Sequence, residues 1–245
     1  MPGLGRRPST DPRNAAHPMR RLLAEVPPEL PVPDLKTWEF LRDPLNQDET
    51  GTCGGHAGAH AIHCAPISHR GFLNPFDLYR EAVGLDEYLD NESDANEQDN
   101  MKLQAGTSGT GVAKALAKRG LITDYLWAAE MRDAILWVLT RGPVMVGSNW
   151  YSSMFVPTPE GFVKISRTAP RVGGHEYLWR AVDVPRGVGE FVQSWGPKWN
   201  AHPTGRWQHT HVRPGHFLMD LDTLERLFRE DGDAVSIREK RGGTH

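Results

Sequence analysis

Three short segments of the 245-residue sequence carry side chains that could perform nucleophilic chemistry. In LNQDETGTCGGHAGAHA, Gln47 lies six residues before Cys53, and Cys53 stands at the predicted start of a helix. In RVGGHEYLWRAVDV, His175 opens a predicted strand, and in EFVQSWGPKW, Gln193 and Trp195 follow another. The positive end of a helix and a nearby imidazolium both lower the pKa of a thiol, which otherwise stays mostly protonated at neutral pH. The three segments together predict a thiolate nucleophile at Cys53 with His175 as its base.

Each of these residues also has an ordinary structural explanation. A single buried cysteine is commonly a small core residue, and a single histidine or loop glutamine is commonly structural. The order and spacing of the three segments favour chemistry, because they resemble the papain-like cysteine peptidases. In that family a glutamine lies six residues before the nucleophile, a Gly-His pair opens a later strand, and Asn-Ser-Trp-Gly follows. The resemblance runs from about residue 35 onward, and the short layout without disulfides or a helical propeptide is similar to bacterial or bacteriophage members.

The resemblance implies a role for each matching residue. Cys53 would be the nucleophile, and His175 would serve as acid and base. The Gln47 amide and the Cys53 backbone N–H would hold the oxyanion, each such donor contributing about 3 kcal/mol. No cofactor is implied.

The candidate substrate-binding residues are Gly106, Thr107 and Trp195. In the family, a glycine-containing loop pairs with the backbone of an extended substrate, and Gly106 with Thr107 holds the matching place. Trp195 would shield the hydrogen bond of the histidine from water.

Two positions depart from the family pattern. Gln193 replaces the asparagine that fixes the histidine tautomer, and it offers the same amide on a stem longer by one methylene. Gly54 stands where many members have an aromatic residue. Gln193 is therefore either a working anchor of the imidazole or a neutral replacement.

Three functions remain open on this evidence. The first is a cysteine peptidase that hydrolyses polypeptides through a Cys53 thioester. The second is a papain-like scaffold with weak or no turnover that serves as a structural or interaction protein, for instance in a bacteriophage virion. The third is a thiol amidase or cell-wall peptide hydrolase with the same site.

The periodicity predicts an α+β protein with two lobes, because a helical first half is followed by a strand-rich second half. The resemblance implies a papain-like two-lobe fold, with a helical N-terminal lobe, an antiparallel, β-barrel-like C-terminal lobe and the active site between them.

A buried helix is expected at about 54–64, because its residues are small. Helices are expected at about 76–88 after a capping Asn74 and at about 109–119 after Thr107 and Ser108, which can cap it. Two more are expected at about 129–140 and 222–229. Short strands are expected at about 144–150, 161–165, 176–184, 190–195, 215–221 and 234–237.

We divide the chain into an arm over residues 1–35, a helical lobe over 36–142 that carries Cys53, and a β-rich lobe over 143–245 that carries His175 and Gln193. The arm is rich in proline and arginine and shows no sustained period. It is either a flexible tail or a segment that packs on the body or on a virion or other protein partner. It is too short to resemble the helical propeptides of secreted members, so inhibition by a propeptide is not expected.

Composition disfavours several other classes of protein. The net charge of −3 gives no field for nucleic acid or an anionic membrane, and no apolar run is long enough to span one. Cys53 and Cys64 lie about 16 Å apart if their segment is helical, so no disulfide is expected, as is typical of a cytoplasmic or cytoplasm-assembled virion protein. No metal site is predicted at either group of three histidines. The residues between His56, His60 and His63 include no carboxylates, and His209, His211 and His216 are expected on a partly solvated face.

Overall fold

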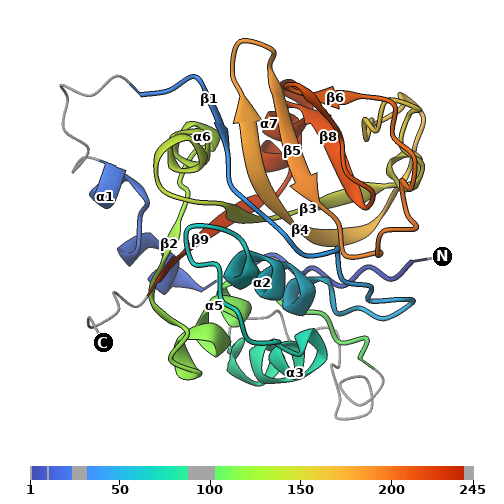
Figure 1. The fold of residues 1–245 in the computed structure, drawn as a ribbon. Helices are drawn as coiled ribbons and strands as arrows, with labels where there is room; N and C mark the ends of the chain where they lie inside the picture. Colours follow the sequence, from blue (N-terminus) through green and yellow to red (C-terminus); the bar gives the residue numbers. More distant parts are fainter. Residues whose placement is uncertain (1, 10, 24–31, 88–102, 240–245) are drawn as a thin grey trace.

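The computed structural model describes residues 2–9, 11–23, 32–87 and 103–239. Figure 1 shows a twisted antiparallel sheet with helices on both faces. The strand order is β2-β9-β3-β4-β5-β8, with β1 paired to β4. The strands of this sheet are β1 (Leu35–Thr37), β2 (Ile122–Trp127), β3 (Val144–Tyr151), β4 (Arg171–Asp183), β5 (Val188–Val192), β8 (His216–Asp220) and β9 (Asp233–Glu239). A separate small ribbon is formed by β6 (Arg206–Trp207) and β7 (Thr210–His211).

Capping side chains stabilise the start of two helices, and a third helix is stabilised by burial. α3 (Pro75–Leu85) is capped by Asn74, whose side chain accepts from the N–H of Phe76 at 3.0 Å. α5 (Gly109–Lys118) is capped by Ser108, whose hydroxyl accepts from the N–H of Gly111 at 3.2 Å. α2 (Cys53–His63) lacks a side-chain cap but is buried along its whole length, as its small residues predicted. The remaining described helices are α1 (Arg20–Leu23), α6 (Met131–Thr140), α7 (Leu221–Arg229) and two 3-10 turns, η1 (Pro12–Ala16) and η2 (Ser152–Phe155).

Most predicted strands are confirmed, one is not, and four strands, β1, β2, β6 and β7, were not predicted. The expected strand at 161–165 is reduced to a single bridge between Phe162 and Leu218. In contrast, β2 was not predicted, because ITDYLW contains a charge and no regular alternation. It becomes a strand by pairing with β9, more than 100 residues further along the chain.

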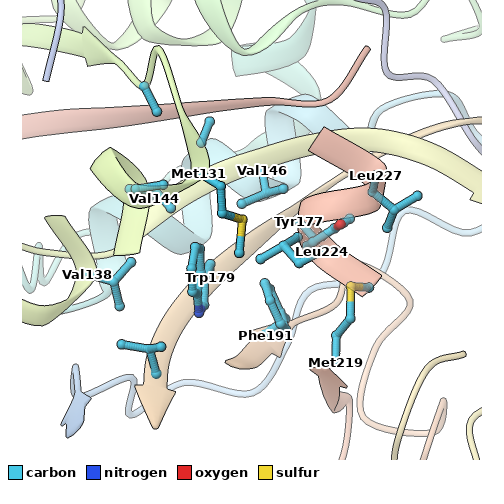
Figure 2. Close-up of a cluster of buried hydrophobic side chains, with 14 of the residues drawn as sticks. Met131, Val138, Val144, Val146, Tyr177, Trp179, Phe191, Met219, Leu224 and Leu227 are labelled. Atoms are coloured by element: carbon cyan, nitrogen blue, oxygen red, sulfur yellow. The ribbon is translucent and has the colours of Figure 1, made fainter. Parts of the chain in front are cut away.

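The sheet separates two apolar layers, and alternation along β4 supplies both. Tyr177 and Trp179 point into the layer under α6 and α7, which Figure 2 shows together with Phe191. Leu178, between them in sequence, points into the opposite layer with α2, α3 and α5. Neighbouring residues of β4 therefore serve opposite faces of the sheet.

The α+β class is confirmed, with one correction to the expected barrel-like lobe. The sheet is not closed into a barrel, because its outer strands β2 and β8 are not paired with each other. The extent of the two lobes stays a prediction. Among the described residues, no helix is long and apolar enough to cross a membrane.

The N-terminal arm packs on the body over residues 2–9 and 11–23, so the flexible-tail interpretation is wrong for these residues. Met19 is fully buried, and its N–H donates to the carbonyl of Trp127 on β2 at 2.9 Å. Asn14 accepts from the hydroxyl of Thr110 on α5 at 3.1 Å. In Figure 1 the arm, in dark blue, continues from these contacts to the N mark, passing between α2 and α5 on one side and β3 and β4 on the other. This course brings residues 3–7 to the site described next.

Candidate active site

Cys53 is the first residue of α2 and is fully buried. Its sulfur lies against the backbone of Glu176 on β4 and of Gly5 in the arm, with which it forms hydrogen bonds. Burial raises the pKa of Cys53 to about 12, and the nearby Glu176 carboxylate acts in the same direction. The thiol is therefore protonated at neutral pH with the arm in place.

His175 lies on β4, one residue before the backbone group that contacts the sulfur. Its Nε2 donates to Oε1 of Gln193, which also accepts from the N–H of Ser194 at 2.8 Å. Because an amide oxygen accepts both bonds, the neutral imidazole carries its proton on Nε2 and leaves Nδ1 as the acceptor. Among the described residues Nδ1 has no hydrogen-bond partner. Burial lowers the pKa of His175 to about 3.

Two tryptophans hold the imidazole. Trp195 stacks on the His175 ring, with centroids 4.7 Å apart and an angle of 27° between the planes. Trp150 meets the same ring edge-on at 4.9 Å. These contacts place Trp195 over the imidazole, where the resemblance expected it, and they exclude water from the Gln193 bond.

Gln47 is fully buried, and its amide is oriented by Ser194. Its Oε1 accepts from the Ser194 hydroxyl at 2.5 Å, so Nε2 faces the other way as a donor. That nitrogen donates to the backbone carbonyls of Thr50 at 2.6 Å and Gly3 at 3.0 Å. The donor expected to bind an oxyanion therefore already binds a carbonyl of the arm.

The loop of Gly106 and Thr107 pairs with the same segment of the arm. Thr107 donates its N–H to the carbonyl of Gly5 at 2.9 Å and accepts from the N–H of Arg7 at 3.0 Å. Between these bonds, Arg6 donates its N–H to the carbonyl of Gly174 at 3.0 Å. The arm therefore occupies the place expected for an extended chain at Thr107, whereas the N–H of Gly106 donates to the hydroxyl of Tyr79 at 2.9 Å.

Sequence reasoning missed two carboxylates beside the site. Glu176 points away from the imidazole, because neighbouring residues of a strand face opposite sides of the sheet. Its oxygens lie near α2 and α5, about where side chains on Gly54 or Gly109 would have to go. A β-carbon on Gly54 would approach Oε2 of Glu176 to 3.2 Å, which leaves no room for the family's aromatic side chain. Asp233 is the first residue of β9, and no sequence motif indicated that it lies near the site. It is placed there by the pairing of β9 with β3.

The histidines of α2 serve the fold. His56 has Nδ1 within 2.9 Å of the carbonyl of Thr52, and His60 accepts from the N–H of Leu45 at 2.9 Å. In the part of the chain that the structure describes, no group of three or more metal-ligating side chains occurs. His216, expected on a partly solvated face, is instead fully buried, where its ring packs beside Phe40 and its Nδ1 lies 3.1 Å from Oε1 of Glu190.

Known structures provide an independent comparison. No family model matches the sequence, and no curated protein is significantly similar to it. The structure is similar to xylellain, a cysteine protease from Xylella fastidiosa, with a TM-score of 0.69 and 16% identity over 98% of this chain and 97% of that one. It is also similar to digestive procathepsin L 3 of Tenebrio molitor, with a TM-score of 0.61 and 10% identity over 96% and 75% of the two chains. For procathepsin B S9 from Trypanosoma congolense, the TM-score is 0.60 and the identity 8% over 96% and 87%.

Identities this low establish the fold alone. Fold neighbours that are cysteine proteases support a peptidase-type function in general. The chain has the fold of the papain-like cysteine proteases.

Proposed function

We propose that this protein is a cysteine peptidase in which Cys53 and His175 form the catalytic pair. The observation that carries the proposal is the hydrogen bonding of the His175 imidazole. Its Nε2 is fixed by Gln193, while Nδ1 is free, on a strand whose next residue contacts the Cys53 sulfur. A base held by one nitrogen and free at the other suits proton exchange with an adjacent thiol.

The proposed reaction proceeds in two halves. The Cys53 thiol gives its proton to Nδ1 of His175, and the sulfur attacks the carbonyl carbon of a peptide bond. Gln47 and the Cys53 backbone N–H stabilise the resulting oxyanion. The imidazolium protonates the departing amine, which leaves a thioester. His175 then takes a proton from water, the hydroxide displaces the sulfur, and a carboxylic acid and the free thiol result.

Gln193 acts through His175 and is a positioning residue in this proposal. The longer stem of glutamine does not prevent the bond, because Oε1 reaches Nε2 while also accepting from the backbone of Ser194. This bond supports a positioning role for Gln193 in place of the asparagine. Trp195 shields the bond, which strengthens it.

Substitution of the nucleophile tests the proposal. Cys53→Ala should abolish hydrolysis of a casein or mixed peptide substrate and remove labelling by iodoacetamide at position 53. Cys64→Ala is the matched control, since Cys64 is the other buried thiol and lies at the far end of α2. Cys64→Ala should retain both hydrolysis of the substrate and labelling at Cys53. Hydrolysis that survives Cys53→Ala would overturn the assignment.

A catalytically silent scaffold is the second candidate, and one observation favours it. Cys53 and His175 are both buried, and burial moves their pKa values apart, to about 12 and about 3. Neither group is then charged at neutral pH. If Cys53 stays unreactive after the arm is displaced by the variants described below, the scaffold is the better description.

A further inference from the structure

The arm places one arginine in a buried acidic environment beside the catalytic pair. The side chain of Arg6 is 1% exposed, and its guanidinium forms an ion pair with Asp233 and donates to the carbonyl of Asp231 at 2.5 Å. A buried guanidinium is stable only when it is paired and hydrogen-bonded. Arg6 therefore fixes residues 3–7 in the site through a charged contact and through the backbone bonds given above.

Gly147 on β3 makes room for this side chain. A β-carbon at this position would lie 2.6 Å from Nε of Arg6 and 2.8 Å from Oδ1 of Asp233. We name Gly147, Glu176 and Asp233 the Arg6 site. Its members come from three neighbouring strands, β3, β4 and β9, so it is built by the sheet and independent of the arm.

The Arg6 site has more acceptors than the arm uses. Glu176 is fully buried, and neither of its carboxylate oxygens has a hydrogen-bond partner among the described residues. Oδ1 of Asp233 is also without one there. Burial raises the pKa of both carboxyl groups, and the charge of the nearby Arg6 acts in the opposite direction. Two buried carboxylates facing one guanidinium form a site suited to a cation with several N–H donors.

The site also lies at the reacting groups. Glu176 supplies the backbone that contacts the Cys53 sulfur, and its carboxylate lies close to Gly54, the residue that follows Cys53. An extended chain held by Thr107 and Gly174 at the nucleophile would place one of its side chains where Arg6 lies.

On these grounds we propose that Glu176, Asp233 and Gly147 form a recognition site for an arginine or lysine side chain of the polypeptide substrate, and that Arg6 occupies it in competition with substrate. This inference rests on the proposed peptidase function. It also revises the expectation that no N-terminal segment inhibits the site.

The arm is not presented for cleavage. The carbonyl of Gly5 accepts from the N–H of Thr107 and is therefore directed away from the nucleophile. The backbone hydrogen bond between Gly5 and the Cys53 sulfur does not involve that carbonyl. The carbonyl bound by Gln47 belongs to Gly3, two residues away. A β-carbon on Gly5 would lie 1.9 Å from the carbonyl oxygen of Gly51, so the close approach requires glycine here. The arm fits the site as an occupant whose backbone does not offer the nucleophile a carbonyl.

The first experiment measures occupancy by the arm without requiring turnover. The full chain and its variants are treated with iodoacetamide at pH 7, and modification of Cys53 is followed by peptide mass spectrometry. Arg6→Ala should react at least about tenfold faster than the unmodified protein, because the thiol becomes accessible. Arg7→Ala removes the same charge one residue away and should react as slowly as the unmodified protein. Gly5→Ala keeps both arginines and should react faster.

The second experiment measures recognition of the basic side chain. In the Arg6→Ala background, cleavage rates are compared for peptides that carry arginine, lysine, glutamine or glutamate at one position and are otherwise identical. The comparison is repeated at each of the four positions before the scissile bond. At one position, arginine and lysine should be cleaved at least about tenfold faster than glutamine. Adding Asp233→Asn should remove most of this preference. Gly147→Ala keeps both carboxylates but fills the place of the guanidinium, and it provides the same test if Asp233→Asn does not fold.

A binding measurement separates failure of this inference from failure of the proposed function. In Cys53→Ala with Arg6→Ala, the peptide PGLGRRPS is compared by calorimetry with the same peptide carrying glutamine in place of its first arginine. Tighter binding of the arginine peptide by at least about tenfold supports the Arg6 site even if no peptide is cleaved. Cleavage without any preference for a basic residue, together with equal binding of the two peptides, would overturn the site and leave the peptidase function standing.

Discussion

At the scale of single residues, the candidate active site depends on hydrogen bonds that fix the orientation of neutral groups. Ser194 has two such roles: its N–H fixes Oε1 of Gln193, and its hydroxyl fixes the amide of Gln47. The base and the proposed oxyanion donor are thereby oriented by one residue. Because all these groups are buried, each depends on its partner for both geometry and charge.

Gln193 should affect the pH dependence of the reaction as well as its rate. In the Arg6→Ala background, Gln193→Ala should lower kcat by about 10- to 100-fold, because the imidazole loses the acceptor that fixes its orientation. Loss of that bond also lowers the pKa of His175, since Gln193 is the group that raises it. The acid limb of the pH–rate profile should therefore shift to lower pH. Gln193→Asn, which restores an amide, should recover part of the rate, and an unchanged profile in both variants would contradict the assignment.

The raised pKa of Cys53 predicts how labelling depends on pH while the arm is bound. Only the thiolate reacts, and a pKa of about 12 leaves a minute thiolate fraction at pH 7. Each added pH unit between 7 and 9 should increase the rate of iodoacetamide modification of Cys53 about tenfold. Peptide mass spectrometry at a series of pH values measures this slope. A rate that already levels off below pH 8 would show that the thiol is ionised in the closed form.

At the scale of elements, β4 connects the site to the core. Its alternation sends His175, Tyr177 and Trp179 to one face of the sheet and Glu176 to the other. One strand therefore carries both the proposed base and a carboxylate of the Arg6 site. The rigidity of this strand comes from the two apolar layers that hold it, including the layer in Figure 2.

Trp179 is the residue at which this support is most readily measured. Its ring is fully buried and stacks on Phe191 at 5.6 Å. Trp179→Ala should lower the free energy of unfolding by about 3 to 5 kcal/mol, the range for a large aromatic removed from a core. Urea denaturation followed by circular dichroism provides the measurement. The control is Phe72→Ala at a side chain that is 71% exposed, which should change stability by no more than about 0.5 kcal/mol.

At the scale of the whole molecule, the fold buries histidines in their neutral form. Burial lowers the pKa of His56 to about 4, and His60, His63 and His216 shift in the same direction for the same reason. Below about pH 6.5, the ordinary pKa of histidine, these histidines bind protons in the unfolded chain but stay neutral in the folded chain. The contribution of these neutral histidines to the free energy of unfolding is therefore fully present above pH 6.5 and decreases as the pH falls toward 4.

His56 allows this dependence to be tested one residue at a time. Between pH 6.5 and pH 4, its contribution to the free energy of unfolding should decline by about 1.4 kcal/mol per pH unit. His56→Phe keeps an aromatic ring against Phe76, which His56 meets edge-on at 5.0 Å, and cannot be protonated. Urea midpoints of this variant should fall less steeply over that range than those of the unmodified protein. Equal slopes would mean that His56 is not buried neutral in solution.

Local information in the sequence was enough for much of this structure. The caps at Asn74 and Ser108 and the small residues after Cys53 predicted three helices, because these signals act within a few residues. The order and spacing of Gln47, Cys53, His175 and Gln193 carried the resemblance from which the candidate site residues were predicted.

Only the tertiary structure decided where distant segments meet. β2 became a strand because β9 paired with it, and the sheet stayed open because its outer strands do not pair. Arg6, Glu176 and Asp233 converge from the arm, β4 and β9, and no local pattern in the sequence relates them. Strand pairing and burial depend on contacts between residues far apart in the chain, whereas the periodicity of a sequence reports only the environment of each segment by itself.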